Sequence, residues 1–127
     1  MRLITGGAYQ GKLDFAIKNY NINTAEIANG ESFNIADLSN IRCINNYHLL
    51  VKKLLENDEN PISATSEIIS ENPDIIIIIN EIGSGIIPLE KSERIWREQV
   101  GKVGCLLAEK ADTVERITCG IAVRIKG

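Results

Sequence analysis

Aromatic residues are scarce in this chain, where they make up 5% of 127 residues. So few rings give little surface for stacking nucleic-acid bases or for lining a carbohydrate groove. Basic residues are not in excess either, since 14 Lys and Arg stand against 17 Asp and Glu, for a formal net charge of -3. Because Lys and Arg supply most contacts to the phosphates of a duplex, we expect no nucleic acid as the main partner.

Cysteine, histidine and long apolar segments are also few. The three cysteines form no C-x-x-C pair, and together with one histidine they make a poor metal site. We therefore expect buried, reduced thiols, as in cytoplasmic proteins. The longest apolar run, residues 75–79, is far too short for a membrane span, and the apolar residues before Gly6 are too few for the core of a signal peptide. The expectation is a soluble, cytoplasmic protein.

Isoleucine, in contrast, is abundant, with 22 residues. The chain is 44% hydrophobic and 24% charged, which is typical of a globular protein, and its length predicts one domain over residues 1–127. Five successive isoleucines at 75–79 cannot alternate between core and water. They predict a strand in the middle of a sheet that helices cover on both faces.

Strands and helices are expected to alternate along the chain. Apolar periodicity predicts helices at residues 12–19, 41–55 and 89–111. Another helix is expected to begin at Asn60-Pro61 and to end at Asn72-Pro73. Strands are expected at residues 3–5, 74–80, 113–118 and 121–125, with a weak one at 25–28. This order predicts an α/β fold with a mostly parallel central sheet flanked by helices, and with two C-terminal closing strands.

A glycine loop lies between the first predicted strand and the first predicted helix. Its residues are Gly6, Gly7, Ala8, Tyr9, Gln10, Gly11, Lys12 and Leu13. They fit the pattern G-x-x-x-x-G-K, in which backbone N–H groups and a helix N-terminus surround phosphate and the lysine reaches the terminal phosphates. A P-loop nucleotide-binding fold is therefore expected, with Lys12 as an exposed loop residue. A plain glycine turn joining strand to helix is the alternative.

Leu13 departs from the P-loop pattern, which has Ser or Thr at this position. The missing hydroxyl normally holds Mg²⁺, so we expect a weak dependence on that metal.

A second glycine motif, NEIGSGIIP, spans residues 80–88. A carboxylate at the carboxyl end of a buried strand, beside a phosphate loop, is placed to bind Mg²⁺ or to accept a proton. Glu81 is accordingly the candidate metal ligand and catalytic residue. A glutamate that only stabilises a turn is the alternative.

These motifs resemble the bifunctional adenosylcobinamide kinase / adenosylcobinamide-phosphate guanylyltransferase family of cobalamin biosynthesis. The resemblance is continuous over residues 74–126, where NEIGSGIIP is followed by RIWRE at 94–98, by A-x-x-A-D-x-V at 108–114 and by a G-I tail that ends in Lys126. The loop GGAYQGKL is similar to the family's GGARSGKS. The family's segments between the first helix and residue 74 have no convincing counterpart. We interpret the chain as a shortened, partly degenerate member.

The resemblance implies that GTP or ATP binds at the loop and that a corrinoid intermediate is the second substrate. It also implies a homo-oligomer, for which the long helix around Trp96 offers an interface. Arg94 or Arg97 would contact nucleotide phosphate or ribose. An ion pair of Arg97 with Glu93, four residues earlier, is the alternative.

Guanylyl transfer in this family passes through a histidine that carries GMP. The one histidine of this chain is His48, which lies one residue out of register with that pattern. Its imidazole is either a neutral nucleophile or a half-buried helix residue beside Ile44 and Val51.

Two functions are consistent with these residues. One is a nucleotide-dependent kinase or nucleotidyltransferase acting on a corrinoid. The other is a non-catalytic nucleotide-binding or interaction protein that keeps only the scaffold, as Leu13 and the missing middle segments suggest.

Overall fold

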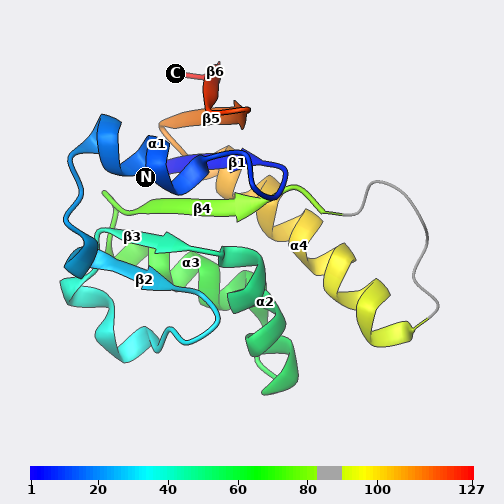
Figure 1. Cartoon of the computed structure of the whole chain (residues 1–127). Coiled ribbons are helices and arrows are strands. Elements are labelled where there is room, and N and C mark those ends of the chain that lie inside the picture. The colour runs from blue at the N-terminus through cyan, green and yellow to red at the C-terminus, as the bar shows by residue number, and fades with distance from the viewer. Residues whose placement is uncertain (83–89) are drawn as a thin grey trace.

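The computed structural model describes residues 1–82 and 90–127 (Figure 1). In this part of the chain, the strands are β1 (Arg2–Gly6), β2 (Ile27–Asn29), β3 (Cys43–Asn45), β4 (Ile76–Asn80), β5 (Thr113–Thr118) and β6 (Ile121–Lys126). The helices are α1 (Lys12–Tyr20), α2 (Tyr47–Glu56), α3 (Pro61–Glu71) and α4 (Lys91–Lys110), with short 3-10 helices η1 (Thr24–Glu26) and η2 (Ile35–Asn40).

The strands form one sheet in the order β2-β3-β4-β1-β5-β6. The first five are mutually parallel, and β6 runs antiparallel to β5 at one edge. Helix α1 covers one face of the sheet, and α2, α3 and α4 cover the other (Figure 1). The predicted α/β architecture, mostly parallel and closed by two C-terminal strands, is confirmed, and it is the arrangement of a P-loop-like fold.

The isoleucine run accounts for the centre of the sheet. Strand β4 lies between β3 and β1, and the side chains of the run alternate between two hydrophobic clusters. Ile75, Ile77 and Ile79 pack towards α2–α4, whereas Ile76 and Ile78 pack towards α1. All five are at most 4% exposed. The prediction of a central strand covered on both faces is therefore confirmed.

Local signals place the helix ends. The Asn60 side chain caps α3 by accepting hydrogen bonds from the N–H groups of Ile62 at 2.9 Å and Ser63 at 3.3 Å, with Pro61 at the first helical position. Helix α1 ends at Tyr20, one residue beyond the prediction. Helix α4 ends at Lys110, one residue short of its prediction.

The region from residue 25 to residue 55 differs from the sequence-based prediction. The predicted helix 41–55 is a strand, β3, followed by α2, so Ile44 lies on the sheet and does not share a helix face with His48. The weak strand predicted at 25–28 is found at Ile27–Asn29. Three-residue strands carry too little pattern to be separated from helical spacing, and pairing with β4 decides the outcome.

The expectation of buried thiols needs correction. Of the three free cysteines only Cys43 is buried, and burial raises the pKa of its thiol to about 12. Cys105 and Cys119 are exposed. Three residues of the apolar stripe of α4, Val100, Val103 and Leu107, are buried against the sheet. The homo-oligomer and its interface on the helix around Trp96 stay predictions. No described helix combines the length and apolar character needed to cross a bilayer.

Candidate functional site

The carboxyl ends of β3, β4 and β1 meet at one edge of the sheet, beside the start of α1 (Figure 1). A cavity of about 370 Å³ opens there. Its described lining consists of seven consecutive residues of the loop and of α1, together with three asparagines: Ala8, Tyr9, Gln10, Gly11, Lys12, Leu13, Asp14, Asn45, Asn46 and Asn80. The carboxyl edge of a parallel sheet is where ligands of open α/β folds bind.

The glycine loop begins where β1 ends. Gly6 is buried with φ at +148°, and a Cβ there would collide with the carbonyl oxygen of Ile117 on β5. Tyr9 and Gly11 have φ of 59° and 85°, so the loop backbone turns through left-handed conformations. The backbone N–H groups of residues 8–11 donate to no acceptor in the described part of the chain. Successive free N–H groups in such a loop form a concave anion site.

Helix α1 adds its positive end to the same place. Gly11 is the N-cap residue and has no side chain to occupy the first N–H groups of the helix. Those groups carry the positive end of the helix dipole, which favours an anion.

Lys12 is the first residue of α1 and is only 7% exposed, so the expectation of an exposed loop lysine is wrong. Its Nζ donates a hydrogen bond of 2.6 Å to the carbonyl oxygen of Gly7. Burial lowers the pKa of the Lys12 ammonium, and the nearby Glu81 carboxylate partly offsets that shift. The cation therefore lies at the base of the loop with a neutral hydrogen-bond partner.

Glu81 follows β4 directly, and its backbone N–H donates to the Gly6 carbonyl at 2.8 Å. Both carboxylate oxygens are engaged by Arg116 of β5, with Nε to Oε1 at 2.8 Å and Nη2 to Oε2 at 2.9 Å. Glu81 raises the pKa of the Arg116 guanidinium, chiefly through this two-pronged hydrogen bond. The pair bridges β4 and β5 across the end of β1.

The residues present do not fit a resident Mg²⁺ ion. Leu13 is half-buried and packs against the α1-side cluster, and both oxygens of Glu81 are held by Arg116. Asp14 is the one carboxylate on the described cavity wall, and the described residues contain no group of three metal-binding side chains. Magnesium usually needs carboxylate oxygens together with substrate phosphates. Glu81 as a metal ligand stays a prediction.

His48 lies in the first turn of α2 and is 6% exposed, more deeply buried than predicted. Its Nδ1 accepts a hydrogen bond of 3.2 Å from the backbone N–H of Asn80, and its carbonyl accepts one of 2.8 Å from Trp96 Nε1. Burial lowers the pKa of His48 to about 4, and the charge of Lys12 adds to that shift.

This arrangement sets the tautomer of His48. A neutral imidazole carries one proton, and because Nδ1 is an acceptor here, the proton is on Nε2. Neither nitrogen then offers a free lone pair for attack on phosphorus. Nucleophilic catalysis by His48 stays a prediction, and it would require the bond to Asn80 to break.

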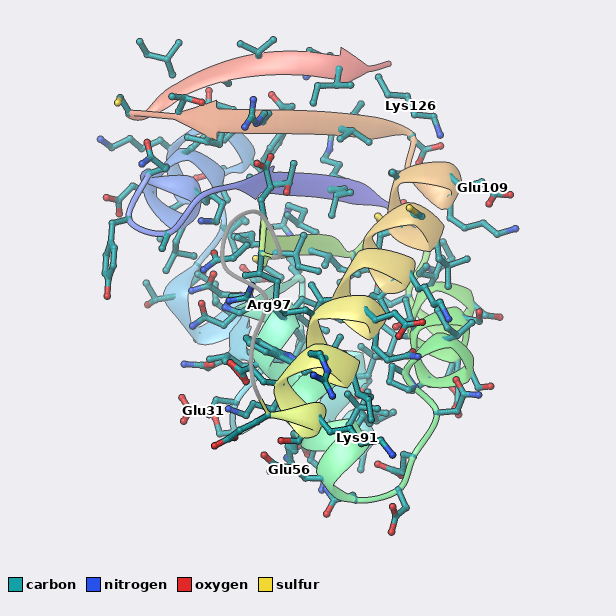
Figure 2. All side chains as sticks on the ribbon, turned by 90° about the vertical axis from the view of Figure 1, so that its right-hand side faces the viewer. Glu31, Glu56, Lys91, Arg97, Glu109 and Lys126 are labelled. Carbon is teal, nitrogen blue, oxygen red and sulfur yellow. The ribbon has the colours of Figure 1, made fainter. Side chains whose placement is uncertain are left out.

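Arg94 and Arg97 lie in the N-terminal half of α4, and neither is among the residues that line the described cavity. Figure 2 labels Arg97 on this helix. Arg94 is exposed, whereas Arg97 is half-buried. Of NEIGSGIIP, only Asn80, Glu81 and Ile82 are among the described residues, so the prediction for residues 83–88 lies outside them.

Two features of the site escaped the sequence analysis. Arg116 gave no signal, because its partner is 35 residues away and the pairing of β1 with β4 and β5 creates the contact. The other feature is an asparagine row at the ends of three neighbouring strands, formed by Asn29, Asn45 and Asn80. Each of these strands ends in Asn, and this is a signal that could have been read.

Comparison with known proteins adds the family. The family model described as cobinamide kinase / cobinamide phosphate guanyltransferase matches residues 34–125. The match begins about forty residues before residue 74, where the resemblance in the sequence begins. The glycine loop precedes the matched segment.

Two curated relatives are similar to part of the chain. The bifunctional adenosylcobalamin biosynthesis protein CobU of Salmonella typhimurium is 38% identical over 52 residues, which are 41% of this chain and 29% of the relative. The protein of the same name from Escherichia coli is 36% identical over 52 residues, with the same coverage of 41% and 29%. The aligned segment thus spans less than a third of either relative, whereas the family model covers most of this chain. The chain belongs to the cobinamide kinase / cobinamide phosphate guanyltransferase family.

Proposed function

We propose that this chain binds the phosphates of GTP or ATP in the loop of residues 6–13 and transfers a phosphoryl group to a corrinoid intermediate of cobalamin biosynthesis. The observation that carries the proposal is the anion cradle. Backbone N–H groups of residues 8–11, which have no acceptor among the described residues, the uncapped start of α1 and the buried Lys12 converge on one cavity. Family membership supports the choice of substrate class.

In this reaction the bond between the γ-phosphorus and its bridging oxygen breaks, and a bond from an acceptor hydroxyl oxygen to the phosphorus forms. The hydroxyl proton leaves to a base and the nucleoside diphosphate departs. Lys12 and the loop N–H groups stabilise the charge on the phosphate oxygens. Glu81 is the candidate base, since a carboxylate that accepts two hydrogen bonds keeps further lone pairs.

We do not propose guanylyl transfer through His48. The hydrogen bond from Asn80 to Nδ1 supports a role as a neutral, fixed side chain that orients the end of β4. If His48 were the nucleophile, incubation with labelled GTP would leave GMP on the protein in an acid-labile, base-stable bond.

A second candidate is nucleotide binding without catalysis. Leu13, in place of a hydroxyl side chain, and the engagement of Glu81 by Arg116 support it. A protein of this kind would bind nucleotide but transfer nothing.

One experiment separates these functions. Calorimetric titration with GTP and ATP, with and without Mg²⁺, measures binding, and γ-labelled nucleotide with adenosylcobinamide measures transfer. The proposal expects both, with transfer reduced at least tenfold in Glu81→Gln and unchanged in Glu67→Gln, a matched exposed glutamate on α3. Binding without transfer would favour the second candidate. Absence of binding would rule out both.

A further inference from the structure

The inference concerns the turn between β5 and β6, and it rests on the proposed function of the glycine loop. Gln10 makes two hydrogen bonds to this turn. Its side-chain Oε1 accepts from the backbone N–H of Cys119 at 2.6 Å, and its backbone carbonyl accepts from the N–H of Gly120 at 2.8 Å. The two ends of the side-chain contact are 109 residues apart in the chain.

The turn has an unusual composition for its geometry. Thr118 pairs with Ile121, so Cys119 and Gly120 form a two-residue hairpin turn. Their φ angles are 51° and 76°, and positive values at both positions are what a type I′ turn requires. Asn, Asp or Gly is preferred at the first position, and cysteine is not. The hydrogen bonds to Gln10 help to hold Cys119 in this conformation.

The backbones of Gly11 and of the turn also lie close to one another. A Cβ added to Gly11 would lie 3.5 Å from the Cα of Gly120, which is ordinary van der Waals contact. Gly11 itself has a positive φ and is immediately followed by Lys12. Two segments with positive φ angles, Gly11 and the turn of Cys119 and Gly120, therefore lie side by side at the start of α1.

We propose that the β5–β6 turn is a structural part of the phosphate site, and that Gln10 is the positioning residue that fixes the loop to it. The Oε1 of Gln10 is bonded to the turn, and its Nε2 donates to the Ala8 carbonyl oxygen at 3.5 Å, so both ends of the amide have partners within the protein. The neighbouring backbone N–H groups are held in one arrangement before the polyphosphate of a nucleotide arrives. Donors that are already ordered lose less entropy on binding, so the hairpin raises anion affinity without touching the anion.

Gln10→Met tests this role, because it removes the acceptor and keeps the length of the side chain. Titration with GTP, ATP and inorganic tripolyphosphate is expected to give about tenfold weaker binding than wild type, the effect of one lost hydrogen bond to the loop. Gln99→Met is the matched control. Gln99 is half-buried on α4 and is not among the residues that line the described cavity, so its substitution should leave affinity unchanged.

Hydrogen exchange supplies a readout that loss of general stability would not give. The amides of Cys119 and Gly120 should exchange faster in Gln10→Met than in wild type. The Cys119 amide should regain protection in Gln10→Glu, whose carboxylate oxygen can accept the same hydrogen bond. Equal affinity of wild type and Gln10→Met, or unchanged exchange at Cys119, would overturn the role of Gln10. A wild-type chain that binds no polyphosphate would instead overturn the proposed function, while exchange still reports on the tether.

Discussion

Two charged side chains near the carboxyl ends of β1 and β4, one at the start of α1 and one directly after β4, have opposite environments. Lys12, after β1, is buried, and its ammonium donates to a neutral carbonyl. Glu81, after β4, is 39% exposed, and its carboxylate is paired with Arg116. Burying a cation beside a neutral partner is costly, so an incoming anion can recover part of that cost at Lys12. Glu81 is partly exposed and already paired with Arg116, so it carries no comparable desolvation cost for a ligand to offset. The difference supports the proposed binding of an anion at the glycine loop, beside Lys12, whereas the charge of Glu81 is already paired.

The largest expected effect comes from breaking the Lys12 side of this comparison. Lys12→Met should weaken GTP and ATP binding by about a hundredfold or more, since a charge-assisted contact to phosphate is lost. The free energy of unfolding should stay the same or increase, because a buried charge is replaced by an apolar side chain. Titration and denaturant unfolding measure the two effects. Lys18→Met, an exposed lysine on the same helix, is the control. A variant with wild-type affinity would remove Lys12 from the site.

The pH dependence of stability sharpens the comparison, because the Lys12 charge also acts on His48. Folded His48 keeps a pKa of about 4, whereas the unfolded chain protonates near the ordinary value of 6.5. Between these values the unfolded state binds the extra proton, so stability falls as pH falls from about 6.5 to about 4. The expected loss is about 2 kcal/mol once solvent screening is allowed for.

Denaturation curves across this range, for wild type and for His48→Gln, isolate the contribution of His48 from that of the carboxylates. Because the chain has one histidine, its NMR titration can be followed directly. In Lys12→Met the pKa of His48 should rise. A wild-type His48 that titrates near 6.5 would contradict the buried, neutral ring.

Leu13→Ser introduces, next to Lys12, the hydroxyl group that a P-loop normally has at this position. Because Leu13 packs, half-buried, against the α1-side cluster, the substitution should lower the free energy of unfolding by about 1 kcal/mol. We expect no gain in the dependence of nucleotide affinity on Mg²⁺, since Glu81 stays engaged by Arg116. Unfolding measurements and titrations with and without Mg²⁺ test this, and a clear gain would show that one hydroxyl completes a metal site.

The smallest effect is expected from the Glu81 side. Arg116→Gln breaks an ion pair whose two side chains are 54% and 39% exposed, so the unfolding midpoint should hardly move. Lys102→Gln, which breaks the exposed pair with Glu98 at 3.1 Å, should behave alike in unfolding. Only Arg116→Gln frees a carboxylate beside the site. Its nucleotide affinity should therefore depend more on Mg²⁺ than that of wild type, and an unchanged dependence would mean that Glu81 does not approach the nucleotide.

The sequence predicted the elements whose signals are local. The isoleucine run has one stable arrangement, and Asn60-Pro61 combines a cap with a preferred first helical residue, so β4 and the start of α3 were found. Strand β3 was missed because three residues beside a helix do not break helical spacing, and its partner β4 decides its conformation. The glycine loop could also be predicted, because its pattern G-x-x-x-x-G-K is formed by residues that are adjacent in the sequence.

The contacts around the loop could not be predicted in this way. Arg116 contacts Glu81 because β4 and β5 are the two neighbours of β1 in the sheet. The hydrogen bond between Gln10 and Cys119 depends on where the turn of the last hairpin lies. The burial of Lys12 also results from tertiary packing, and no pattern of neighbouring residues in the sequence predicts it.

Two members of the asparagine row, Asn45 and Asn80, line the cavity together with Asn46, and this affects how its binding responds to pH. An amide has no proton to gain or lose in the usual range, and it offers both a donor and an acceptor. The wall formed by Asn45, Asn46 and Asn80 therefore presents the same chemistry to a ligand in acid and in base. A change of affinity with pH would then arise from the ligand phosphates or from ionisable side chains around the cavity, such as Lys12 on its wall and the neighbouring His48 and Glu81. The dependence of affinity on pH therefore reports on those ionisable groups, because the asparagine side chains themselves do not titrate.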